Sequence, residues 1–292
     1  MAKRITTTKD LNLALERFFQ GMTQIGASSK GDVFDETVRK NLLNELNGAV
    51  FIDHKRWGDK SSTSIFKEYR EQSLTKNFDF TSLKPITDNG VRLNLMVIDK
   101  PNGSQNWPDL LIVYNQIGLP LEVKSTEKDS IVWNSGFPRF DSLYIFNCYG
   151  KSKTTCFLGQ HAINQQELAD LMTASKDASI HNKKCGGERW SYYVRDMFNS
   201  NQSYIENKKL LEEAQKMCEQ INQQELVIKN GSLTDKQKAS ALKVIDEKTA
   251  KFMNLDNTYQ QQVQQRKNRE SDVFDFLKKL SWNSSQHSNF SS

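Results

Sequence analysis

The chain carries, at residues 107–126, the stretch WPDLLIVYNQIGLPLEVKST. Leu110–Tyr114 is a short apolar run, partly β-branched, and such a run predicts a strand buried on both faces. Asn115–Gly118 supplies turn residues, because Asn and Gly tolerate positive φ. Leu119–Ser125 then predicts a returning strand on which charged and apolar side chains alternate. We therefore expect a β-hairpin over this stretch.

The expected register of the hairpin brings three ionisable residues to one face. If Asn115 faces Gly118, counting back places Asp109 opposite Lys124, and directly opposed residues point to the same face of a sheet. Glu122 shares that face because side chains alternate along a strand. A slip of one residue would send Asp109 to the other face. The sequence thus predicts that two carboxylates and one ammonium converge on a small patch.

These residue types suit the hydrolysis of a phosphodiester. Hard cations such as Mg²⁺ take carboxylate oxygens as ligands and keep several waters. The bound cation stabilises charge on phosphoryl oxygens and acidifies a bound water. A lysine beside the metal can orient or deprotonate that water, or hold the phosphate.

Pro108-Asp109 followed by Glu122-Val123-Lys124 resembles the signature of the PD-(D/E)XK nuclease superfamily, and most closely its type II restriction endonucleases. The resemblance implies that Asp109 and Glu122 are metal ligands and that Lys124 is a catalytic lysine. It also implies an α/β (α+β) restriction-endonuclease-like core, a mixed central sheet flanked by helices. Dependence on Mg²⁺, double-stranded DNA as substrate and a homodimer that cuts both strands are further expectations from it.

A looser likeness to the same family continues beyond the motif, through Trp133–Arg139 to the expected strand Leu143–Phe146. The competing interpretation is that the motif is accidental. Short Pro-Asp and Glu-x-Lys matches arise by chance, and Glu and Lys that alternate along a strand usually form a solvated face.

A second expected helix, from Asp32 to about Asn47, offers further carboxylates. Asp35 and Glu45 project within its apolar stripe, where an unpaired carboxylate is costly. Gly31-Asp32-Val33-Phe34-Asp35 also resembles a Gly-x-x-Phe-Glu helix opening of these nucleases, which implies Asp35 as a third metal ligand, with Asp in place of Glu. The alternative is that Asp35 and Glu36 only favour the positive end of the helix.

The composition fits a globular protein. The chain has 292 residues, 37% of them hydrophobic, and a net charge of +5, which is compatible with DNA binding without demanding it. The sequence holds no apolar run long enough to span a bilayer and no apolar signal segment at its start. We expect a cytoplasmic protein with no membrane partner and no nucleotide cofactor. The four cysteines form no CxxC pair, so free thiols are expected.

Three regions differ in composition. Residues 1–200 contain strands with flanking helices and predict the nuclease core. Residues 201–282 are rich in Gln, Glu, Lys and Leu and predict a helical subdomain for dimerisation or DNA clasping, with two long helices over Tyr204–Val227 and Thr234–Arg266 and a shorter third over Asp272–Leu280. Sustained heptad order is not expected there. Residues 283–292 predict a disordered tail.

Candidate DNA contacts come from segments near the hairpin. Asn134 and Arg139 can read base edges, and Lys151 and Lys153 can neutralise phosphates, although each can equally be a solvated surface group. Three functions compete: a sequence-specific restriction endonuclease, a repair or structure-specific nuclease of the same superfamily, and a non-catalytic helical DNA-binding or assembly protein. The large irregular loops and the helical region favour the first, since readers of a site need extra scaffold.

Overall fold

The computed structural model describes most of the chain. The described residues are 4–26, 30–104, 106–133, 137–140, 142–185, 198–199, 202–231 and 233–283. They divide into two compact units, of which the first holds residues 1–202 with 269–292 and the second holds residues 203–268. None of the helices in the described ranges is long and apolar enough to cross a lipid bilayer.

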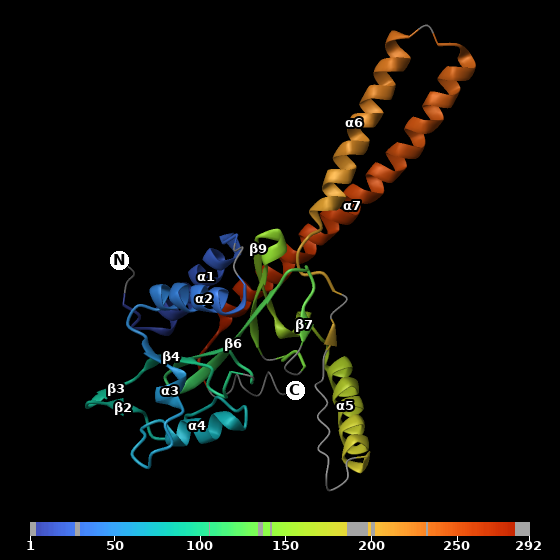
Figure 1. Cartoon of the computed structure of the whole chain (residues 1–292). Helices are drawn as coiled ribbons and strands as arrows, with labels where there is room; N and C mark the ends of the chain where they lie inside the picture. Colours follow the sequence, from blue (N-terminus) through green and yellow to red (C-terminus); the bar gives the residue numbers. More distant parts are fainter. Residues whose placement is uncertain are drawn as a thin grey trace. The chain divides into compact units, whose positions relative to one another are not determined.

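A mixed six-stranded sheet forms the centre of the first unit, as predicted (Figure 1). Its strands, in spatial order, are β1 (Val50–Ile52), β4 (Leu95–Asp99), β5 (Leu110–Tyr114), β6 (Ile117–Thr126), β8 (Leu143–Cys148) and β9 (Lys153–Leu158). The pairs β1 with β4 and β6 with β8 are parallel, and the other neighbours are antiparallel. Every residue of β5 is buried, so the strand that precedes the motif turn lies covered on both faces.

Helices cover both faces of this sheet. The first face carries α1 (Thr8–Gln24), α2 (Gly31–Glu45) and the last part of α7 (Asp235–Lys279), whose apolar residues join one core cluster with β5, β6 and β8. The second face carries the short α3 (His54–Trp57) and α4 (Lys67–Leu74) over an aromatic cluster. Figure 1 shows α1 and α2 on the opposite side of the strands from α4. These layers confirm the predicted α/β fold class.

The remaining elements of the first unit are short, apart from one helix. They are a small hairpin of β2 (Thr87–Asp88) and β3 (Val91–Arg92), the pair β7 (Val132–Trp133) and β10 (Phe198–Asn199), the 3-10 turns η1 (Tyr149–Lys151) and η2 (Gly159–His161), and α5 (Gln165–Cys185). Residues 284–292, most of the segment expected to be a disordered tail, lie outside the described residues.

The register of the β5–β6 hairpin differs from the expected one by two residues. Tyr114 pairs with Ile117, so only Asn115 and Gln116 form the turn, with φ of 47° and 72°. The expectation that Asn115 faces Gly118 was therefore wrong, because both turn residues adopt the left-handed conformation that a two-residue hairpin turn requires. A shift of two residues preserves the face of each side chain, so the convergence on one face survives the correction.

The second unit is a helical hairpin of α6 (Lys208–Asn230) and the part of α7 up to residue 268. Lys248 Nζ donates to Gln220 Oε1 and Asn207 N donates to Gln262 Oε1, so the helices run antiparallel. Figure 1 shows them side by side. The helices expected at Thr234–Arg266 and near the end are one continuous helix of 45 residues. Because residues 269–283 pack into the first unit, the second unit is shorter than the predicted 201–282.

Heptad spacing is sustained in this hairpin, contrary to expectation. At least partly buried residues recur along α7 in alternating steps of four and three, as in a coiled-coil seam. The series is Ala241, Ile245, Lys248, Phe252, Leu255, Tyr259, Gln262 and Arg266, and that of α6 is Leu210, Ala214, Met217, Ile221, Gln224 and Ile228. Polar members hide the repeat, because a search for apolar residues alone passes over Lys248, Gln262 and Arg266.

Candidate active site

The β5–β6 hairpin places the three motif residues together. Asp109 immediately precedes β5, while Glu122 and Lys124 alternate on β6. The Asp109 backbone nitrogen donates to Glu122 Oε2 at 3.1 Å, and the Val123 nitrogen donates to Asp109 Oδ2 at 2.9 Å. Asp109 therefore lies beside Glu122, and not directly opposite Lys124 as the expected register had it.

Lys124 is held by the carboxylate next to it. Its Nζ lies 2.6 Å from Glu122 Oε1, and the two side chains are only 17% and 10% exposed. The ammonium also lies over the Trp133 ring, 5.8 Å from its centroid. Burial lowers the pKa of Lys124, but Glu122 and Asp109 outweigh it and hold that pKa above its ordinary value. Lys124 is therefore a cation at neutral pH in the metal-free protein.

The carboxylates of Asp109 and Glu122 share a neighbouring ammonium group, that of Lys124. Burial, and then the charge of Asp109, raise the pKa of Glu122 to about 7. Burial likewise raises the pKa of Asp109, although Lys124 and the hydrogen bond from Val123 oppose the rise. Two buried acids that share one ammonium cannot both ionise without cost. A further cation at this place would remove that cost.

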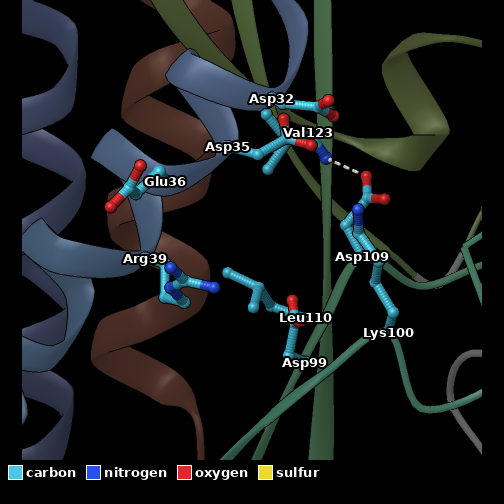
Figure 2. Close-up of a pocket in the computed structure, with 9 residues that line it drawn as sticks. All are labelled: Asp32, Asp35, Glu36, Arg39, Asp99, Lys100, Asp109, Leu110 and Val123. Atoms are coloured by element: carbon cyan, nitrogen blue, oxygen red, sulfur yellow. Dashed lines mark hydrogen bonds between the residues drawn. The ribbon is translucent and has the colours of Figure 1, made fainter. Parts of the chain in front are cut away.

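Asp35, on α2, shares a pocket with Asp109, whereas Glu122 and Lys124 do not line that pocket. Asp35 lies beside Asp109 in this pocket of about 190 Å³, and Figure 2 shows its side chain extending from the helix toward β6. Burial, and then the charge of Asp109, raise the pKa of Asp35 to about 6. The lining residues are Asp32, Asp35, Glu36, Arg39, Asp99, Lys100, Asp109, Leu110 and Val123. Burial is therefore the main influence on Asp35, and the charge of Asp109 is the second.

Of the other three acids of α2, Asp32 is exposed in the first turn at the pocket, and Glu36 and Glu45 have partners of their own. Glu36 reaches the pocket rim, but its carboxylate lies 2.9 Å from Lys40 Nζ and is about half exposed. Glu45 lies 2.9 Å from Arg17 Nε and does not line the pocket. Asp35 is thus the acid of α2 best placed to act with the motif.

The donor set suits a hard divalent cation. Asp109, Glu122 and Asp35 offer carboxylate oxygens, and Mg²⁺ binds through one or two carboxylates while keeping several waters. Within the described ranges, no three His, Cys, Asp or Glu side chains are arranged as a ready-made metal cluster. In the metal-free protein, the carboxylates of Asp109 and Glu122 instead accept hydrogen bonds from within the group. The donors are the backbone nitrogens of Asp109 and Val123 and the ammonium of Lys124.

The predicted DNA contacts are not part of this pocket. The Arg139 guanidinium lies 5.4 Å from the centroid of the Trp107 ring, and Lys151 Nζ lies 2.8 Å from Asp129 Oδ2. Lys153 begins β9, paired with Cys148. The fourth candidate, Asn134, lies outside the described residues. Among the described three, none lines the pocket.

Two basic residues that line the pocket, Lys100 and Arg39, were not predicted from the sequence. Lys100 follows β4, and Asp99 pairs with Leu110, so the antiparallel pairing of β4 with β5 brings Lys100 to Asp109. Arg39 lies one helical turn beyond Asp35 on the same face of α2. The helical spacing of Arg39 was a usable signal. The position of Lys100 depended on the pairing of two strands whose register was not considered.

Comparison of the chain with protein-family models, with curated proteins and with solved structures gave no match.

Proposed function

We propose that this protein is a Mg²⁺-dependent, site-specific endonuclease of double-stranded DNA, acting as a type II restriction enzyme of the PD-(D/E)XK kind. The observation that carries the proposal is the hydrogen-bonded group of Asp109, Glu122 and Lys124 at one end of a buried hairpin, with Asp35 beside it. Chance matches to a short motif have no reason to place an additional half-buried carboxylate, from a helix distant in sequence, in the same pocket as Asp109.

Each residue has a role in the proposal. Asp109 and Glu122 are the proposed metal ligands, with Asp35 as a third, because all three offer carboxylate oxygens and burial raises the pKa of each. Bound Mg²⁺ supplies a Lewis acid and lowers the pKa of a coordinated water. Lys124, a cation tied to Glu122, orients the attacking water or holds a phosphate oxygen. The deprotonated amine that a general base requires is disfavoured in the metal-free site by the raised pKa of Lys124.

Double-stranded DNA is the proposed substrate, and a homodimer is the proposed assembly, because two copies of one active site are needed to cut both strands at one place. The net charge of +5 allows approach to a polyanion. A repair or structure-specific nuclease would use the same four residues, so the pattern of cleavage must separate the two functions.

The deciding experiment is digestion of phage DNA with Mg²⁺, followed by sequencing of the fragment ends. Discrete ends that share a sequence are expected. A smear of ends would favour the repair or structure-specific nuclease, and no cleavage would favour a non-catalytic DNA-binding protein.

Matched variants tie any cleavage to the site. Asp109→Ala and Lys124→Ala are each expected to lower the cleavage rate by at least ~10²-fold, the usual effect of removing a group that acts on the reacting atoms. Glu45→Gln and Arg17→Ala are the controls, since these residues pair with each other and neither lines the pocket. Cleavage that survives both site substitutions would exclude the motif as the active site.

A further inference from the structure

Lys100 is attached to the site through its backbone. It follows Asp99, the last residue of β4, and adopts a left-handed conformation with φ of 45°. Its backbone nitrogen donates to the carbonyl oxygen of Asp109 at 2.8 Å. The main chain at Lys100 is therefore fixed to the main chain of the first motif residue, and the position of its side chain depends on the sheet and not on a free loop.

The side chain of Lys100 lies in the pocket with the carboxylates. It is half-buried, and Figure 2 shows it extending toward the carboxylate of Asp109. Its positive charge acts on both Asp35 and Asp109, lowering the pKa of each. Lys100 therefore lies close enough to both acids for its charge to be felt by them.

The two lysines of the site differ in how their ammonium groups are engaged. Lys124 Nζ makes a 2.6 Å ion pair with Glu122. Lys100 has no ion pair within 4.0 Å among the residues that the structure describes, so its three N–H donors are directed to the pocket space or to solvent. The other basic lining residue, Arg39, lies over the Phe51 ring, 5.2 Å from its centroid. Lys100 is the lining cation best placed to bind an incoming anion beside Asp109.

A DNA phosphate needs such a cation here. Five of the nine lining residues are Asp or Glu, and two are basic, so an approaching phosphate meets mostly negative charge. A bound divalent cation offsets part of that charge, and a lysine at the rim offsets more while donating hydrogen bonds to the phosphate oxygens.

We propose that Lys100 is a substrate-contacting residue that donates to a non-bridging oxygen of the DNA phosphate at this pocket, while Lys124 remains with Glu122. The proposal rests on the nuclease function proposed above. It assigns the two lysines different tasks, since Lys100 binds the phosphate and Lys124 serves the reacting groups.

The test compares Lys100→Ala, Lys100→Arg and a control, Lys84→Ala, an exposed lysine that does not line the pocket. Binding of a duplex that contains the cleavage site is measured with Ca²⁺ in place of Mg²⁺, as a function of salt. Loss of one phosphate contact is expected to reduce the slope of log affinity against log salt by about 0.9. We expect Lys100→Ala to weaken binding roughly tenfold and to raise KM, whereas Lys100→Arg restores most of both.

A purely electrostatic role for Lys100 predicts another result. If Lys100 only offsets the charge of Asp35 and Asp109, Lys100→Ala should lower the Mg²⁺ concentration for half-maximal cleavage and leave DNA affinity and the salt slope unchanged. That outcome would overturn the phosphate contact and leave the nuclease function standing. A wild-type protein that neither binds nor cuts DNA would overturn both proposals. A duplex with an uncharged methylphosphonate at the scissile position should abolish the difference between wild type and Lys100→Ala.

Discussion

Asp109 and Glu122 are joined across the mouth of the β5–β6 hairpin by a hydrogen bond of 3.1 Å from the backbone nitrogen of the first to the carboxylate of the second. The Asp109 side chain returns a bond to this strand by accepting from the Val123 nitrogen at 2.9 Å. The pair thus closes the hairpin at the end away from its turn. The same two carboxylates that the proposed chemistry requires also fix the strands that carry them.

Substitutions of Asp109 should separate these two roles. Asp109→Asn keeps an oxygen that can accept from Val123 N–H and removes a buried charge, so we expect it to be at least as stable as wild type without metal, and inactive. Asp109→Ala leaves the Val123 N–H without its acceptor, which costs about 1–3 kcal/mol. Urea denaturation at pH 7 without metal measures the difference between the variants. Equal stability of the two would show that the bond to Val123 contributes nothing.

The stability of the metal-free protein should fall as the pH rises from about 4 to 7. The pKa of Asp35 rises from 3.8 to about 6 and that of Glu122 from 4.5 to about 7, with burial as the main cause. In this window the folded protein holds protons that the unfolded chain has released, so the free energy of unfolding decreases with pH. Thermal melting across the window measures the effect.

Two comparisons isolate the contribution of these acids to the pH dependence. Asp35→Asn and Glu122→Gln should each flatten the fall. The groups whose lowered pKa acts in the opposite direction, the half-buried His161 and the exposed Glu36, Asp53 and Asp59, are the same in all three proteins. Under the proposed function, Mg²⁺ should stabilise the protein more at pH 8 than at pH 5. A pH profile unchanged by both substitutions would contradict the assignment of the raised pKa values.

Asp35 and its neighbour Glu36 provide a matched pair for the metal site. Asp35 is beside Asp109, whereas Glu36 pairs with Lys40 at 2.9 Å. We expect Asp35→Asn to raise the Mg²⁺ concentration for half-maximal cleavage roughly 10- to 100-fold, the range seen when a supporting ligand is lost. Glu36→Gln should leave it unchanged. Equal effects of the two would mean that only the net charge of the helix end matters.

The hairpin and the shared face of Asp109 and Glu122 could be predicted because a register error of two residues leaves each side chain on its face. The turn proved to be Asn115-Gln116, two residues shorter than expected, and Asp109 and Glu122 still share a face. The exact partner of Asp109 could not be predicted, because Gln has no preference for the positive φ that Gln116 adopts. Its side-chain bonds to the Phe80 and Leu83 carbonyls, which stabilise this conformation, come from a segment distant in sequence.

Residues that reach the site from other elements were harder to foresee. Asp35 was identified through the pattern of its helix, while Lys100 was missed because its place depends on the pairing of β4 with β5. The continuity of α7 was also missed. Residues 267–271 lack apolar side chains and read as a break, but Arg269 is buried and Glu270 accepts from Thr155 Oγ1 at 2.7 Å. The helix therefore continues through a segment without apolar residues, where a prediction from hydrophobicity alone would place its end.

Two substitutions in α7 test whether the heptad-spaced residues between α6 and α7 stabilise this hairpin. Ile245 is a partly buried member of the seam, and Leu242 is 51% exposed. Ile245→Asp would place a charge between the helices and should destabilise the hairpin by about 1–3 kcal/mol, whereas Leu242→Asp should change stability by less than about 0.5 kcal/mol. Loss of helical circular dichroism on urea titration measures both. Equal effects of the two would exclude a specific seam.

Substitution by alanine should change the stability of the protein in opposite directions at Gly118 and Gly21. A Cβ on Gly118, in β6, would lie 2.7 Å from Phe78 Cβ and 2.9 Å from Leu111 Cδ1, whereas a Cβ on Gly21, on the exposed side of α1, would meet nothing within 4 Å. Gly118→Ala should destabilise the protein by about 1–3 kcal/mol, because a packed core does not yield space freely. Gly21→Ala should stabilise it by roughly 0.5–1 kcal/mol through helix propensity.

The effect of Gly118→Ala should also reach the active site. Gly118 lies four residues before Glu122 on the same strand, and its nitrogen donates to the Phe78 carbonyl at 2.8 Å. Any displacement of β6 away from Phe78 therefore moves the strand that carries Glu122 and Lys124. Under the proposed function we expect reduced cleavage in Gly118→Ala even at temperatures where the variant is folded, and normal cleavage in Gly21→Ala. Full activity in a folded but destabilised Gly118→Ala would mean that the active-site end of β6 is held by the Asp109 bonds alone.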